Sequence, residues 1–188
     1  AMNADDGVDI LEDVEDFLIY PNQLLLQPGE QQVVTVTWVG AQDLKVEKAF
    51  RLIVEELNLS LEEDEEAEDM TVKLAALTKV IKAAYVAPAG VKADVIVDGA
   101  EVVSDASGKK QIKFTLFNQG TAHTIMKETP ISLAGLTSDG KDMEGQSKRF
   151  VPQPLSGVVN VLAQSKRSFV IDVPEGISSD ISGVRVSL

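Results

Sequence analysis

The sequence predicts an all-β protein built from antiparallel sandwiches, and three observations support that fold class. Apolar and polar residues alternate with a period of two in several short segments, as half-buried strands require. Clusters of Gly, Asp, Asn and Ser, which favour turns, separate these segments. The hydrophobic content of 44% is enough for a packed core. Short strands at such spacing are typical of sandwich folds.

The first half of the chain contains two clear strand segments. In QQVVTVTWV, the side chains of Val34, Val36 and Trp38 share one face. The segment AFRLIVEEL at 49–57 repeats the alternation. A Pro-Gly-Glu turn at 28–30 separates the first segment from the apolar run FLIYP. This arrangement predicts a hairpin followed by a further strand.

A longer segment at 68–88 has no internal turn residue. Its Ala, Leu and Lys residues are compatible with a helix. The alternation of apolar residues from position 72 and the closing YVAP instead favour a strand that ends at Pro88. We prefer a strand at about 70–86, much longer than the usual length of about five or six residues, and the helix stays open as an alternative.

The second half continues with QIKFTLFN, KRSFVIDV and GVRVSL, separated by the turn sequences SDASGKK, NQGT, TSDGKD and PEG. The small and polar stretch AGVKAD after Pro88 is a natural boundary. We therefore expect two β-sandwich domains, at 1–88 and 89–188.

Composition and motifs argue against several classes of function. The net charge of −13 disfavours a nucleic-acid partner, because phosphate binding needs clustered cations. The absence of cysteine excludes disulfides and thiolate metal sites. No apolar run is long enough to span a membrane, so membrane insertion is not expected. Because nucleotide-binding and hydrolase motifs are also missing, we expect no enzyme activity and no cofactor or metal; His123, the single histidine, is expected to be a surface or packing residue.

The acidic run LEEDEEAED at 61–69 is best interpreted as a solvated loop. A calcium site is the alternative, although the spacing of the acids does not follow that of an EF-hand. An apolar edge strand in a chain with few catalytic groups points instead to binding by strand addition.

The order of these segments resembles a known family. The stretches YPNQLLLQPGEQQVVTVTWVG, EKAFRLIVEEL and LTKVIKAAYVAP are similar to the N-terminal domain of periplasmic pilus (fimbrial) assembly chaperones. FTLFNQGTAH and SKRSFVIDVP are similar to the family's C-terminal domain. The resemblance implies two immunoglobulin-like β-sandwich domains and a periplasmic location. It also implies a chaperone that stabilises pilus or fimbrial subunits by donor-strand complementation and delivers them to an outer-membrane usher.

Site residues follow from the resemblance by position. The long last strand of the first domain would insert Val72, Leu74 and Ala76 into a groove of the subunit. Lys82 would anchor the carboxylate at the C-terminus of the subunit, with Lys79 as the alternative.

Two departures from the family matter. Glu47 corresponds to an acid of an interdomain salt bridge, but YVAP lacks the Arg that many relatives carry before the last Pro. The family's first strands also have no counterpart, so the first domain is expected to be incomplete at its N-terminus. We interpret the sequence as a fragment of a longer product; self-association or strand swapping with a neighbouring molecule is the alternative. A structural tandem immunoglobulin-like module of a bacterial surface adhesin, with calcium at 62–69, is the second functional hypothesis.

Overall fold

The computed structural model describes residues 2–5, 8–57, 77–126, 129–150 and 160–188. These residues form strands and no helix, which confirms the predicted all-β class. The strands of the first half are β1 (Met2–Asp5), β2 (Val8–Leu11), β3 (Phe17–Tyr20), β4 (Thr35–Trp38), β5 (Lys48–Glu55) and β6 (Lys79–Val86). Those of the second half are β7 (Val95–Ser104), β8 (Lys110–Asn118), β9 (Thr124–Ile125), β10 (Ile131–Leu136), β11 (Asp142–Phe150), β12 (Asn160–Val161), β13 (Lys166–Asp172) and β14 (Gly183–Ser187).

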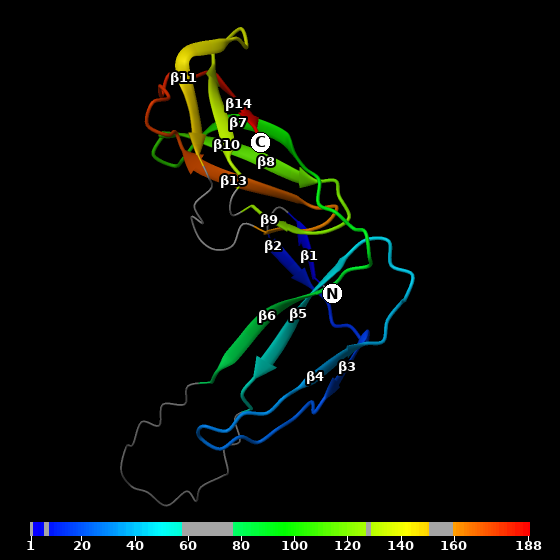
Figure 1. The fold of residues 1–188 in the computed structure, drawn as a ribbon. Helices are drawn as coiled ribbons and strands as arrows, with labels where there is room; N and C mark the ends of the chain where they lie inside the picture. Colours follow the sequence, from blue (N-terminus) through cyan, green and yellow to red (C-terminus); the bar gives the residue numbers. More distant parts are fainter. Residues whose placement is uncertain (1, 6–7, 58–76, 127–128, 151–159) are drawn as a thin grey trace, which may run out of the picture.

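The first half contains a sheet in the order β2-β1-β5-β6 and the separate hairpin β3–β4. β5 and β6 pair along their whole length, from Lys48 opposite Val86 to Glu55 opposite Lys79. Residues 79–86 therefore form a strand, and the helical alternative fails there because pairing with β5 satisfies the backbone of the segment. The predicted strand at about 70–86 is wrong at residues 77–78, which precede the strand, and its part at 70–76 lies outside the described residues. Figure 1 shows the two paired strands extending away from the second half.

An aromatic cluster joins the hairpin to β5. The ring of Phe17 on β3 lies 4.8 Å from that of Phe50 and 5.1 Å from that of Trp38, between centroids. Phe50 is buried at 3% exposure. Farther along β5 on the same face, Val54 is 57% exposed. The core of the first half is thus closed near the second half and open toward the far end of β5.

The second half has a closed core between two three-stranded sheets, β13-β8-β7 and β11-β10-β14. The alternation of QIKFTLFN is confirmed, because Ile112, Phe114 and Leu116 of β8 are buried at 3% exposure or less. They pack against Leu133 of β10 and Val184 of β14 in one cluster. Burial of this kind is the main term that stabilises a sandwich of this size.

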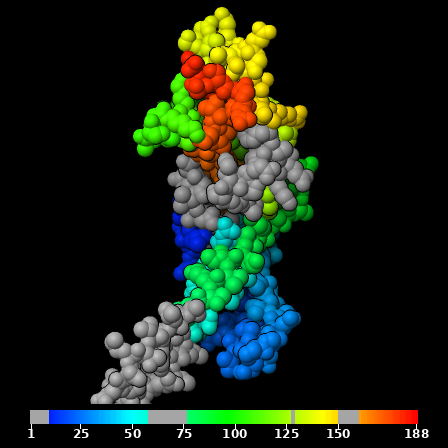
Figure 2. All heavy atoms as spheres, turned by 90° about the vertical axis from the view of Figure 1, so that its left-hand side faces the viewer, coloured from blue at the N-terminus to red at the C-terminus, as the bar shows by residue number. Residues whose placement is uncertain are grey.

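Exposure differs sharply between the two halves. Of the twenty-two exposed large hydrophobic side chains among the described residues, eighteen precede residue 88 and four follow it. Figure 2 shows the first half, blue to green, below the second half. Most of the exposed large apolar side chains of the described residues therefore lie in the first half.

Candidate functional site

Strand β6 is the last strand of its sheet, so one backbone edge has no strand partner among the described residues. Two large apolar side chains on it are exposed, Val80 at 42% and Ile81 at 50%. Exposed edge strands offer unpaired N–H and C=O groups to other chains. This edge can bind an extended segment by strand addition. The predicted donor residues Val72, Leu74 and Ala76 lie outside the described residues.

The two predicted anchor lysines lie on opposite faces of β6, since they are three residues apart on a strand. Lys79 forms an ion pair with Glu55, the residue opposite it on β5. Lys82 lies opposite Leu52, is exposed, and makes no ion pair within the described part of the chain. The structure therefore does not bring the two amino groups together, and Lys82 is the one available to an incoming anion.

Glu47, which directly precedes β5, contacts the segment after β8. Its N–H donates to the carbonyl of Thr121 at 2.9 Å. Its Oε1 accepts from the backbone N–H of His123 at 3.0 Å and lies 2.6 Å from Nδ1 of the same residue. Because a carboxylate oxygen only accepts, Nδ1 carries the proton. The Glu47 side chain is 5% exposed, so this contact is shielded from water.

Tyr85 on β6 adds further contacts between the two halves beside those of Glu47. Its ring stacks on the imidazole of His123, with centroids 3.7 Å apart and planes 7° apart. Its hydroxyl accepts a hydrogen bond from Asn160 Nδ2 at 2.8 Å. Next to it, Leu162 packs with Ala49 and Tyr85 in a small apolar cluster. The C-terminal end of β6 is therefore held to the second half by both polar and apolar contacts.

The position of His123 is set by the turn between β8 and β9. Asn118, fully buried, accepts the N–H of Gly120 at 3.0 Å and donates to the carbonyl of Ala122 at 2.8 Å. A Cβ on Gly120 would lie 2.4 Å from the carbonyl oxygen of Lys92, so only glycine fits there. These contacts place the imidazole of His123 against Tyr85.

His123 was predicted to be a surface or packing residue, and its stacking on Tyr85 is a packing role; its partners, Glu47 and Tyr85, were not predicted. Glu47 likewise had no predicted partner. Glu47 and His123 are far apart in the sequence, and no local spacing links them. The buried asparagine in LFNQGTAH is the one sequence signal of an ordered turn at this place.

The carboxyl groups with shifted pKa values lie elsewhere, on exposed turns and strand ends. The Ser107 hydroxyl and the Lys109 N–H lower the pKa of Asp105. Gln111 and Lys109 lower the pKa of Asp172. Both acids stabilise local structure in the second half and have no contact with β6.

None of the described residues forms a cluster of histidines and acids suited to a metal ion. Nor do the described ranges include a helix that could cross a lipid bilayer. The acidic run at 61–69 is outside these ranges.

Comparisons with known proteins add no relative: no protein-family model and no curated protein matches this chain.

Proposed function

We propose that this protein is a periplasmic chaperone that binds pilus or fimbrial subunits by donating a β-strand, and that it delivers them to an outer-membrane usher. The observation that carries the proposal is the exposed edge of β6, with apolar side chains and an available lysine. Two immunoglobulin-like domains, divided near residue 88, are part of the proposal. The resemblance of the sequence motifs to the chaperone family supports it.

In the proposed complex, the subunit pairs its backbone with the open edge of β6. Val72, Leu74 and Ala76, which precede β6 in the chain, fill the subunit's groove with alternate side chains. Lys82 binds the carboxylate at the C-terminus of the subunit through a charge-assisted hydrogen bond. Lys79 is the weaker candidate, because Glu55 already neutralises its charge.

The contacts of Tyr85 hold the C-terminal end of β6 against the second half. Because its ring and hydroxyl are held by His123 and Asn160, the strand leaves the second half in one orientation. A pre-ordered strand loses less conformational entropy on binding than a flexible one. The contacts of Tyr85 with the second half thus favour binding of an unstable subunit by β6. The adhesin-module alternative depends on the acids at 61–69, outside the described residues, and no observation favours it.

The test is co-production of the chain with a fimbrial subunit in a bacterial periplasm, with soluble subunit measured by quantitative immunoblot. We expect the chain to raise subunit recovery, and Lys82→Ala to reduce the gain. Lys79→Ala is the matched control on the same strand and should leave the gain unchanged. A charged residue at Leu74 should abolish binding while the second half stays folded. If the wild-type chain fails to raise the recovery of any subunit tested, the proposal is wrong.

A further inference from the structure

Strand β5 has a second backbone edge, opposite β6, that is largely open. On that side β1 pairs with β5 at one position only, Met2 opposite Ala49. No strand pairs there with residues 52–55 in the part of the chain that the structure describes. An inner strand with such an open edge is an acceptor for another strand, because its N–H and C=O groups need partners.

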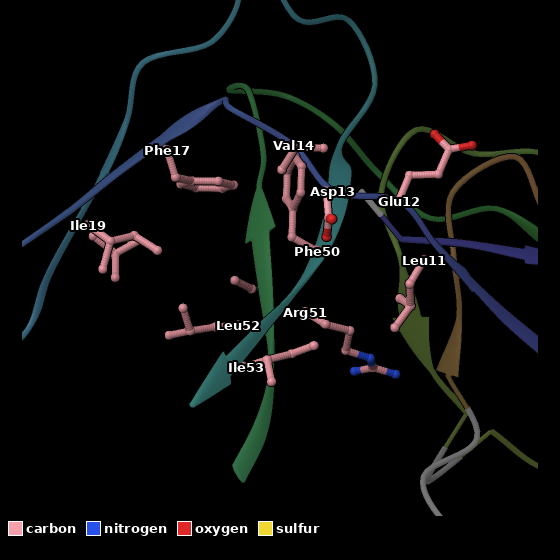
Figure 3. A pocket seen from close by; sticks show the side chains of 12 residues that line it. Leu11, Glu12, Asp13, Val14, Phe17, Ile19, Phe50, Arg51, Leu52 and Ile53 are labelled. Atoms are coloured by element: carbon pink, nitrogen blue, oxygen red, sulfur yellow. The ribbon is translucent and has the colours of Figure 1, made fainter. Parts of the chain in front are cut away.

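A groove of about 260 Å³ lies beside this edge. Its walls are apolar: Phe17, Ile19 and Val36 come from the hairpin β3–β4, and Leu52 and Ile53 come from β5. Figure 3 shows Phe17 and Ile19 on one side of the groove and Leu52 on the other. An open backbone edge next to an apolar wall is the arrangement that binds an extended strand with alternating side chains.

Three of the residues that line the groove are charged, two acids and one cation. Glu12 and Asp13, in the segment between β2 and β3, line it together with the single cation Arg51. A strand that enters the groove should therefore carry positive charge as well as apolar side chains.

We propose that the groove receives strand β6 of a second copy of this chain. β6 is the exposed opposite edge of the same sheet. Its sequence KVIKAAYV contains two lysines and no acid, although the chain as a whole has a net charge of −13. Val80 and Ile81 are exposed, and Lys82 makes no ion pair within the described residues, whereas Lys79 pairs with Glu55 of its own copy. β6 thus combines the apolar surface with the one positive charge that the groove requires. Its eight residues are more than enough to cover residues 52–55.

The incoming strand has room to run in one direction only, parallel to β5. The start of β5 is covered by its own second half, where Glu47 bonds to Thr121, and by β1 at Ala49. The incoming β6 continues at Val86 into the second half of its own copy. Running parallel to β5, it places that end beside Glu55, where the two second halves do not collide.

The resulting contact is head-to-tail, since it joins two different edges. Each copy keeps one edge open after pairing, so further copies can add. The contact occupies β6, which a fimbrial subunit would also need. Pairing of two copies requires no fimbrial partner, however, and so it can be present or absent independently of the proposed function.

The test is analytical ultracentrifugation of the full 188-residue chain from about 1 to about 300 µM, the range in which moderate affinities appear. We expect the mean mass to rise with concentration above the monomer mass of 20.2 kDa. The donor variant Val80→Asn/Ile81→Asn, which removes the apolar side chains without adding charge, and the acceptor variant Ile53→Lys should each be monomeric. Val170→Lys changes a similarly exposed residue of β13, 49% exposed, and should behave as the wild type.

Mixing the two variants distinguishes this contact from every symmetric one. The acceptor variant still offers an intact β6, and the donor variant still offers an intact groove. An equimolar mixture should form a 1:1 dimer that grows no further. A wild-type chain that stays monomeric, or variants that fail to complement, would overturn the proposal. So would a dimer that loses stability with the donor change but not with the acceptor change, since that result indicates pairing of β6 with β6.

A second measurement covers the case in which a variant does not fold, as judged by circular dichroism. A synthetic peptide KVIKAAYV should compete for the groove and return the wild-type chain to monomers. A peptide of the same composition in scrambled order is the control. Assembly that persists at saturating KVIKAAYV peptide, to the same extent as with the scrambled one, would contradict the assignment.

Discussion

The hydrogen bonds of Glu47 should couple the two halves of the protein. Its Oε1 accepts from two groups of His123, at 3.0 Å from the backbone N–H and 2.6 Å from Nδ1. Glu47→Ala removes both bonds and leaves the two donors without this acceptor. Each hydrogen bond to a charged group contributes about 1.5–3 kcal/mol. The His123 side chain is 24% exposed, so water can replace part of the loss. We therefore expect a loss of about 3 kcal/mol in the free energy of unfolding.

Urea denaturation followed by two probes measures this effect. The fluorescence of Trp38, the single tryptophan, reports on the aromatic cluster of the first half. Circular dichroism reports on the whole chain, in which the second half has the larger closed core. In the variant, the Trp38 transition should move to lower urea and separate from the dichroism transition. Independent unfolding of the first half would follow from the lost contact.

Two further variants complete the design. Glu30→Ala is the control, because Glu30 is exposed and, among the described residues, bonds within its own turn, to the N–H of Gln27; its effect should stay within about 0.5 kcal/mol. A double-mutant cycle with His123→Ala should give a coupling energy above about 1 kcal/mol. A change below about 0.5 kcal/mol in Glu47→Ala, with the two probes still coincident, would refute the reasoning.

Three other predictions concern single contacts. Tyr85→Phe removes the acceptor of Asn160 Nδ2 and should lower stability by about 1 kcal/mol, measured by thermal unfolding; an unchanged midpoint would contradict it. Leu133→Ala in the closed core, where the side chain is 1% exposed, should cost about 2–5 kcal/mol and shift the dichroism transition; a loss below that range would mean that the core can close around the gap. Ser107 lowers the pKa of Asp105 in the folded protein. The Asp105 carboxylate therefore contributes its full stabilisation of the turn above its ordinary pKa of 3.8. This stabilisation is lost as the pH falls through the lowered pKa of the folded state. The stability difference between wild type and Asp105→Asn should thus disappear in strong acid, and a difference that persists there would contradict the assignment.

Local patterns in the sequence were sufficient to predict the strands. In β8, alternation with a period of two placed Ile112, Phe114 and Leu116 on one face, and all three are buried. That outcome is local, because the strand geometry itself directs successive side chains to opposite faces. The turn sequences between strands act locally as well, through the conformations that glycine and asparagine allow.

The same patterns did not predict whether a face would be covered. Val36 belongs to an alternating segment like that of β8, yet it is 40% exposed. Coverage depends on a second sheet that closes over the first, and β3–β4 closes over β5 only near Phe50. The residues of a strand do not determine how far the sheet that packs against it extends.

Partners across long sequence separations were decided by the tertiary structure alone. The composition of 79–86 fits a helix or a strand, and pairing with β5 selected the strand. Glu47 contacts His123 because two segments far apart in the chain meet where the two halves join. The sequence by itself determined the all-β class, the strand segments and their apolar faces, since these depend on neighbouring residues. The tertiary structure decided which edges and faces stay open, because backbone pairing and packing depend on segments distant in the chain.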